Sequence, residues 1–519
     1  MQVAQINMSS VELLNFRRWW GDGIALLSGT LGTLSMAPFN FSYLAIVSAL
    51  LLIFTLRDVS VRHALWRGWL YGFGLFLTGS SWVYVSIATY SEAGVIGAGA
   101  LALLFASVLA LIPMAKSMLM RRFFNLHSPL VLLTAVPAIW VLIDWLQSWL
   151  FTGFPWLYLG YSQLTTPLAG FAPIFSVYGV TLAVVLSAAF ILIILRGPSH
   201  NWRYLSIIGL VVLFAFGMIL KKVPWTQPDS QPFQVGLVQG NVTMSMKWDP
   251  EQWTDNIEHY QELSQPLFLN NKTRLIIWPE TAVPILAHQI PGPLAELNEQ
   301  AKVRNIGLVF GIPLQFRGQF FNGMLGVGNA HGAYMKRHLV PFGEYWPSWS
   351  EFFGRWLHLP MSDFTAGKEN QKLMRLGKMS FISLICYEVG FPELVREGLP
   401  WGGFIVAISD SSWFGHSIAK YQMLEMAQMR ALETGRYFLN VDNSGVTAVI
   451  SPMGKVLNQA KPDHSEVTTG EITTMQGATP WVSDGTHLIG LVILLLLAVA
   501  VFIQTRGKNN DKQGKNSYF

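Results

Sequence analysis

Long apolar stretches with few ionisable residues restrict most strongly what this chain of 519 residues can fold into. Hydrophobic residues make up 51% of it and charged residues 13%, about half the charged share usual for soluble domains. A helix that crosses a bilayer needs about 20 mostly apolar residues. The sequence therefore predicts an α-helical membrane bundle with eight spans, near residues 23–37, 41–56, 65–88, 94–115, 129–147, 168–195, 204–220 and 485–504.

The positions of the basic residues support eight spans, because Lys and Arg collect in loops that face the cytoplasm. With eight spans, the following residues all lie on one side: Arg17, Arg18, Arg57, Arg62, Arg67, Lys116, Arg121, Arg122, Arg196, Arg203, Arg506, Lys508, Lys512 and Lys515. The opposite short loops, near 38–40, 89–93 and 148–167, contain no Lys or Arg. We therefore expect both chain ends in the cytoplasm. The alternative for the N-terminal apolar run is a cleaved signal peptide, but no clear cleavage site follows it.

Acidic residues are concentrated in the stretch 223–482, which has the composition of an ordinary globular domain. The sequence predicts a membrane domain over 1–222, this globular domain on the non-cytoplasmic face, a last span over 483–505 and a disordered basic tail over 506–519. Short β-branched runs alternate with helical patterns, which indicates an α/β layered domain. Strands are expected at 233–239, 275–278, 306–312, 379–385, 404–408, 437–441 and 446–450, with a hairpin over 319–338 and helices at 251–268, 293–303, 391–398 and 417–435.

Three reactive residues, Glu280, Lys336 and Cys386, each come at or just after the end of a predicted strand. Taken singly, each has an ordinary explanation as a loop carboxylate, a surface lysine or a packed thiol. Together they supply the parts of nucleophilic acyl transfer. A neighbouring ammonium lowers the pKa of a thiol, and a carboxylate can take up its proton and return it. The ammonium and a backbone N–H, such as that of Tyr387, can stabilise an oxyanion.

Several motifs around these residues resemble those of the nitrilase, or carbon–nitrogen hydrolase, superfamily. They occur in order as Trp-Pro-Glu-Thr at 278–281, Tyr-x-Lys-x-x-Leu-Val-Pro-Phe-Gly-Glu at 334–344, Ile-Cys-Tyr-Glu at 385–388, Phe-Pro-Glu at 391–393, Trp-Phe-Gly at 413–415 and Arg-Ala-Leu-Glu-Thr-Gly-Arg at 430–436. The resemblance implies an αββα sandwich. Seven spans before this domain, one after it, and Gly-Phe-Pro-Trp at 153–156 resemble the bacterial apolipoprotein N-acyltransferase family. In one place, Ser409–Ser412, we expect Asn-Asp-Ala before the Trp, which leaves the role of Asp410 open.

The resemblance implies a ping-pong reaction on the periplasmic face of the bacterial inner membrane. Cys386 would take a fatty acyl chain from a membrane phospholipid as a thioester, with Glu280 as general base and Lys336 stabilising the oxyanion. The acyl chain would then pass to the N-terminal α-amine of the diacylglyceryl-cysteine of an apolipoprotein. The partners are thus two lipid-anchored substrates and the bilayer. No cofactor or metal is expected, since the sequence has no phosphate loop or zinc-ligand spacing, and no nucleic acid, since it has no basic stripe.

Five further residues are candidates for supporting roles in such a site: Glu344, Glu388, Tyr387, Trp248 and Trp413. Glu344 is expected to orient Lys336 or to stabilise the tetrahedral intermediate, and Glu388 to support the same group. Trp248 is expected either on a lid over the acyl chain or in core or interface packing.

Two features near the outer ends of the spans have open interpretations. Asp144 is expected at the membrane interface beside Trp145, with a functional intramembrane acid as the alternative. The aromatic loop 153–161 is either an interfacial belt or a lipid-facing wall beside the site.

Two other classes of function remain as alternatives. A membrane-tethered amidase or nitrilase would use water as the second acceptor. A multi-span transporter or scaffold with an inactive domain is less consistent with the sequence, because the predicted spans contain almost no charge that could line a solute path.

Overall fold

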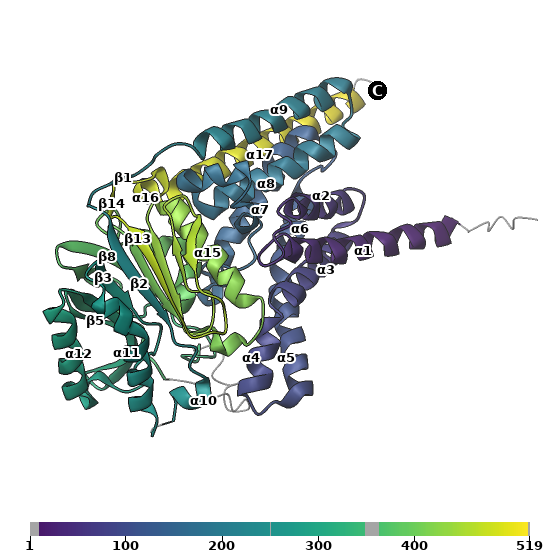
Figure 1. The fold of residues 1–519 in the computed structure, drawn as a ribbon. Coiled ribbons are helices and arrows are strands. Elements are labelled where there is room, and N and C mark those ends of the chain that lie inside the picture. Colours follow the sequence, from purple (N-terminus) through teal and green to yellow (C-terminus); the bar gives the residue numbers. More distant parts are fainter. Residues whose placement is uncertain (1–9, 250, 348–362, 517–519) are drawn as a thin grey trace, which may run out of the picture.

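The computed structural model describes residues 10–249, 251–347 and 363–516. A helical bundle and an α/β domain lie against each other (Figure 1). The bundle consists of α1 (Ser10–Leu34), α2 (Leu44–Leu56), α3 (Val61–Gly79), α4 (Trp82–Tyr90), α5 (Gly94–Leu109), α6 (Leu111–Phe123), α7 (Pro129–Gln147), α8 (Ala172–Arg196), α9 (His200–Leu220) and α17 (Thr486–Asn516). Helix α17 returns from the α/β domain and packs against α7 and α8.

Helices occur at all eight predicted spans, but not all are long enough to cross a membrane. Within the described residues five qualify by length and composition: Gly94–Phe123, Pro129–Gln147, Pro167–Arg196, His200–Leu220 and Thr486–Arg506. Helices α3 and α4, bent by 56°, make a sixth if they are one broken span. Helix α2 has 13 residues and is about 20 Å long, shorter than a hydrocarbon core of about 30 Å. The chain is a membrane protein, and the count of eight spans stays a prediction.

Two features of the bundle differ from the sequence-based expectation. Asp144 is buried within the bundle: it is 2% exposed and forms an ion pair with Lys116, which lies inside α6 rather than in a loop after it. Pairing inside the bundle explains this, because neither charge is tolerated alone in an apolar environment. The expected disordered tail begins as a helix, since α17 continues to Asn516, and residues 517–519 lie outside the described residues.

The α/β domain is built on one continuous sheet of twelve strands, in the order β12-β11-β10-β9-β8-β7-β6-β5-β4-β3-β2-β13. The strands are β2 (Phe233–Gln239), β3 (Thr273–Ile277), β4 (Gly307–Phe316), β5 (Gln319–Gly328), β6 (Ala330–Met335), β7 (Met374–Leu376), β8 (Met379–Ile385), β9 (Ile405–Ser409), β10 (Phe438–Asp442), β11 (Ala448–Ile450), β12 (Val456–Gln459) and β13 (Glu466–Ile472). Strands β2–β4 are parallel, as are β8–β10, and the other pairs are antiparallel.

The sheet folds back on itself, so that β10 contacts β2 and β12 contacts β13. Its inner faces share one apolar core, in which Val235 and Ile277 from one half meet Ile385 and Val406 from the other. Helices α11 (Trp253–Leu269) and α12 (Pro291–Val303) cover one outer face, and α15 (Ala419–Thr434) packs on the other side (Figure 1). The predicted αββα sandwich is confirmed.

Helix α15 is also the main contact between the sandwich and the bundle. It packs against α8, and its Glu433 accepts hydrogen bonds from Ser176 Oγ at 2.6 Å and from the Val177 amide at 2.7 Å. Glu425, which lies about two turns before Glu433 in the same helix, accepts a hydrogen bond from the Ala37 amide at 3.2 Å. The α/β domain is thus attached to the membrane bundle through buried polar contacts as well as apolar packing.

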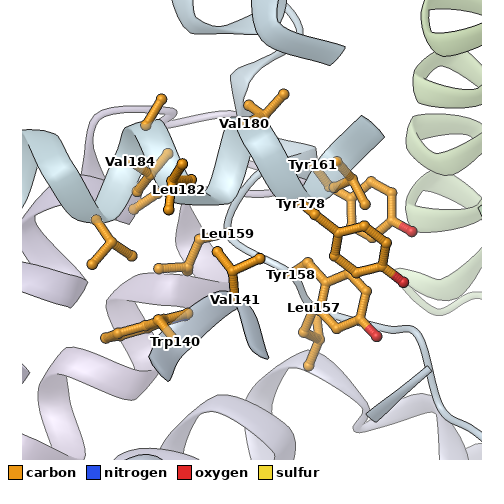
Figure 2. Packing of buried hydrophobic residues seen from close by; sticks show 14 of the residues in the cluster. Trp140, Val141, Leu157, Tyr158, Leu159, Tyr161, Tyr178, Val180, Leu182 and Val184 are labelled. Carbon is orange, nitrogen blue, oxygen red and sulfur yellow. The ribbon is translucent and has the colours of Figure 1, made fainter. Parts of the chain in front are cut away.

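The aromatic loop 153–161 is buried between the two parts of the molecule, so that both lipid-facing interpretations of it are wrong. Its Tyr158 and Tyr161 rings stack with centroids 5.8 Å apart, and Tyr158 also lies 5.9 Å from Tyr178 of α8. Figure 2 shows these three rings together, beside Leu157 and Leu159. The expected position beside the candidate site is correct, because Gly153 O accepts a hydrogen bond from the Tyr387 hydroxyl.

Candidate active site

Glu280, Lys336 and Cys386 follow the C-terminal ends of β3, β6 and β8. Lys336 Nζ lies 3.6 Å from Glu280 Oε1. Both side chains are buried, with Glu280 7% and Lys336 1% exposed, whereas Cys386 is partly exposed. The structure therefore brings the three residues to one edge of the sandwich, close enough for the charges of Glu280 and Lys336 to act on Cys386.

A second carboxylate completes the environment of the lysine. Lys336 Nζ lies 2.9 Å from Glu344, and the Val340 amide donates to the other side of that carboxylate at 2.7 Å. Asn322 Nδ2 donates to both Glu280 and Glu344, at 2.7 and 2.8 Å. Sequence reasoning missed Asn322, because it lies inside β5 and no motif marks it. The arrangement agrees with the expectation that Glu344 orients Lys336.

Burial and charge set the protonation states of this cluster. Burial raises the pKa of Glu280, against the opposing effect of Lys336. Burial alone would lower the pKa of Lys336, but Glu344 and Glu280 outweigh it and the pKa is raised, so Lys336 stays a cation.

The thiol behaves differently from the sequence-based expectation. Burial and then the Glu280 carboxylate raise the pKa of Cys386 well above its usual value, and the lowering effect of Lys336 does not compensate. Cys386 therefore rests as a thiol. A thiol that attacks a substrate needs a neighbouring base to take its proton, and Glu280 is the carboxylate whose charge acts most strongly on Cys386.

The backbone at Cys386 is held in a strained conformation. Its φ of 54° lies in the left-handed region, which costs a non-glycine residue about 1–3 kcal/mol. Glu388, fully buried two residues on, accepts hydrogen bonds at 2.7–3.0 Å from the amides of Ile385, Arg337 and His338 and from the Tyr334 hydroxyl. One carboxylate thus joins the segment after β6, which carries Lys336, to the segment after β8, which carries Cys386.

Aromatic side chains pack together next to Cys386, between the sandwich and the bundle. The Tyr387 ring stacks on Trp156 with centroids 6.3 Å apart. His338 packs on Phe391 at 3.7 Å, and burial lowers the pKa of His338 to about 4. His338 is therefore neutral and belongs to this apolar wall. Its proximity to Lys336 in the sequence was the only signal that could have singled it out.

The two tryptophan candidates have different surroundings. Trp248 follows α10 (Met244–Lys247) and is 47% exposed, so core packing is wrong for it. Trp413 lies in a short turn, η7 (Ser411–Phe414), and packs edge-on against Tyr90 of α4 with centroids 4.9 Å apart. Trp413 thus contacts the membrane bundle.

The structure shows what Asp410 contacts. It follows β9 and forms a buried ion pair with Lys247 of α10, which sequence reasoning missed. Ser412 donates to it from its amide at 3.1 Å and its hydroxyl at 2.6 Å. Burial opposes ionisation, but Lys247 outweighs burial and lowers the pKa of Asp410. The ammonium of Lys247 also lies 3.3 Å from the backbone oxygen of Glu280.

Both parts of the chain match known families. Residues 28–190 match the apolipoprotein N-acyltransferase N-terminal domain, and residues 234–480 match the carbon–nitrogen hydrolase family. Among curated proteins, an apolipoprotein N-acyltransferase of Coxiella burnetii (strain RSA 493) is 40% identical over 481 residues, which cover 91% of this chain and 98% of that protein. The same name is given to an Azotobacter vinelandii protein (40% identity; 92% and 94% covered) and a Pseudomonas syringae pv. tomato protein (38%; 93% and 97%). The chain belongs to the apolipoprotein N-acyltransferase family and is an acyltransferase of the carbon–nitrogen hydrolase superfamily.

Proposed function

We propose that this protein transfers a fatty acyl chain from a membrane phospholipid to the N-terminal α-amine of the diacylglyceryl-cysteine of an apolipoprotein, through a thioester on Cys386. The observation that carries the proposal is the cluster of Lys336 between Glu280 and Glu344 beside the single cysteine of the chain. The names of the relatives support the acceptor, and the packing of α15 on the membrane bundle supports a donor that lies in the bilayer.

In the first half-reaction Glu280 takes the thiol proton while Cys386 Sγ attacks the ester carbonyl carbon of the phospholipid. The charge that develops on the carbonyl oxygen is stabilised by the Lys336 ammonium and a backbone N–H, such as that of Tyr387. The tetrahedral intermediate then breaks its bond to the glycerol oxygen. That oxygen takes the proton from Glu280, lysophospholipid leaves, and the acyl chain remains on Cys386 as a thioester.

In the second half-reaction the lipoprotein α-amine attacks the thioester carbonyl carbon. Glu280 takes a proton from the amine, and Lys336 again faces the oxyanion. The carbon–sulfur bond breaks, and the Cys386 thiolate recovers the proton from Glu280 while the amide is released. The acyl chain is already activated as an ester and then as a thioester, so the reaction consumes no other source of energy.

The supporting residues divide into two groups in this scheme. Glu344 accepts from Lys336, and Asn322 donates to both Glu280 and Glu344, so these two residues keep Lys336 and Glu280 in register. Glu388 connects the turn that carries Cys386, here called the nucleophile turn (385–388), to the segment after Lys336. The Tyr387 hydroxyl bonds this turn to the loop 153–161. The exposed Trp248 provides apolar surface for a lid over the acyl chain.

The proposed location follows from the basic residues and from the substrates. The bundle would lie in the bacterial inner membrane with both chain ends in the cytoplasm and the sandwich in the periplasm. Both substrates are anchored in the outer leaflet of that membrane, so an active site on this face reaches them without extracting either from the bilayer.

A transfer assay tests the function directly. Purified protein is incubated with phospholipid vesicles carrying a labelled acyl chain and a synthetic diacylglyceryl-cysteine peptide with a free α-amine. Label should appear on the peptide together with an equal amount of lysophospholipid, and Cys386→Ala should abolish both. A peptide with an acetylated α-amine is the control acceptor. Hydrolysis of small amides without transfer to the peptide would favour the hydrolase alternative and contradict the proposal.

A further inference from the structure

Lys247 is a buried lysine that takes no part in the chemistry above. It is 2% exposed, at the end of α10. Among the described residues its ammonium contacts two polar groups, the carboxylate of Asp410 and, at 3.3 Å, the backbone oxygen of Glu280. A buried ammonium is unfavourable unless it is paired, so these two groups determine where the Lys247 side chain lies.

The counter-ion of Lys247 is itself firmly held. Asp410 accepts from Ser412, as described above, and from Asn443 Nδ2 at 3.1 Å. Asn443 also binds the backbone of Val242, accepting from its amide at 3.0 Å and donating to its oxygen at 2.7 Å. Both ends of the segment 242–247 are therefore fixed to the same polar cluster beside Glu280.

The peptide that Lys247 contacts is strained. Thr281, which shares a peptide bond with Glu280, has a φ of 50°, a conformation that β-branched residues rarely adopt. Strand β4 comes close to this peptide at Gly311, where a Cβ atom would lie 2.4 Å from Thr281 N. Lys247 and the β4 backbone together confine a peptide that would otherwise relax.

We propose that Lys247 is a positioning residue: its ammonium, with Asp410 as fixed counter-ion, holds the strained Glu280–Thr281 peptide and thereby sets the position of the Glu280 carboxylate relative to Cys386. This inference rests on the proposed role of Glu280 as the base. It gives Asp410 a role that the sequence left open.

The test measures single-turnover release of lysophospholipid, with no acceptor present, by the full-length protein in phospholipid vesicles. Lys247→Met should lower this rate by about 10–100-fold, because a misplaced base loses much of its effect. The apparent affinity for phospholipid should not change. Lys420→Met is the matched control, since Lys420 is also buried and pairs with Asp463 at 2.8 Å, and the described contacts of this pair do not include the Glu280–Thr281 peptide.

A second background separates positioning from general loss of structure. Thr281→Gly removes the strain, because glycine adopts positive φ readily. The loss caused by Lys247→Met should therefore be much smaller in the Thr281→Gly background than in the wild type. If Lys247→Met does not accumulate as folded protein, the near-isosteric Asp410→Asn, which leaves the ammonium without a counter-ion, should show the same dependence on Thr281.

Two results would overturn the inference while leaving the proposed function intact. One is a wild-type rate of lysophospholipid release in Lys247→Met or in Asp410→Asn. The other is that Lys247→Met lowers this rate by the same factor with Thr281 present and in the Thr281→Gly background. Failure of the wild-type protein itself to release lysophospholipid would instead overturn the proposed function, and this inference with it.

Discussion

At the residue scale, the chemistry depends on one ammonium shared by two buried carboxylates beside a thiol that rests protonated. Lys336 lies 2.9 Å from Glu344 and 3.6 Å from Glu280. Removal of the lysine would leave two buried carboxylates without a counter-ion, so Lys336 has a structural as well as a catalytic role in the proposed scheme.

The raised pKa of Glu280 predicts the pH dependence of the first half-reaction. The base must be ionised, so the rate falls as pH falls through the pKa of Glu280. Because burial raises that pKa, the acid limb should lie above the value of 4.5 usual for Glu. The pH profile of single-turnover lysophospholipid release measures it. An acid limb at or below the ordinary Glu value would contradict the buried-base assignment. The residual activity of Glu280→Gln should lack this limb, because the amide has no carboxyl group to ionise.

Glu388 offers a test of how the nucleophile turn is held. In Glu388→Gln an NH2 group replaces one acceptor oxygen and leaves at least one buried donor unpaired, a cost of about 1–3 kcal/mol. Acyl-enzyme formation should fall roughly 10–100-fold through displacement of Cys386. Glu466→Gln is the control, because the Glu466 carboxylate also accepts a backbone N–H, that of Lys461, but at an exposed position. Equal activity of the two variants would show that Glu388 does not position the nucleophile.

At the element scale, strands bounded by clear turns could be predicted, while weakly marked strands could not. The strands at 233–239 and 379–385 have the predicted bounds. Strands β7, β12 and β13 were missed, because β7 is three residues long and β12 is largely exposed. Strand β13 was missed because long-range pairing defines it: it forms its ladder with β2, far away in the sequence.

The same distinction applies to the candidate site. Glu280, Lys336 and Cys386 could be predicted because each follows a strand within a motif. Asn322 and Lys247 could not, because one lies inside a strand and the other in a short helix, and their roles arise from contacts with residues distant in the chain.

Helix α15 carries a buried acid at its contact with the bundle, which predicts a pH-dependent stability. Burial raises the pKa of Glu425 from 4.5 to about 8. The folded protein therefore binds this proton more tightly than the unfolded chain, and stability falls as pH rises from about 4.5 to about 8, by at most ~1.4 kcal/mol per pH unit.

Glu425→Gln keeps an acceptor for the Ala37 amide and removes the ionisation. Its Tm should exceed that of the wild type by an amount that grows between pH 5 and about pH 8. Thermal unfolding in detergent measures this, with Glu471→Gln on the exposed part of β13 as control. A pH-independent difference in Tm would rule out a buried, protonated Glu425.

At the scale of the whole molecule, the proposed orientation requires the sandwich and the C-terminal end of α17 to lie on opposite sides of the membrane. Since Cys386 is the only cysteine, Cys386→Ala provides a cysteine-free background. Gln459→Cys on the sandwich should react with a membrane-impermeant maleimide in intact spheroplasts. Arg506→Cys should react only after lysis. Labelling of Arg506→Cys in intact spheroplasts would contradict the cytoplasmic location of the C-terminus.

In the proposed reaction the single thiol of the molecule carries the acyl chain between two lipid-anchored substrates. Mass spectrometry of the Cys386 peptide can detect this intermediate in full-length protein that is incubated with phospholipid alone and digested at low pH to preserve thioesters. We expect the mass of a fatty acyl group on Cys386, lost when the diacylglyceryl-cysteine peptide is added before digestion. An unmodified Cys386 in protein that still transfers acyl chains to the peptide would show that the reaction does not pass through this thiol.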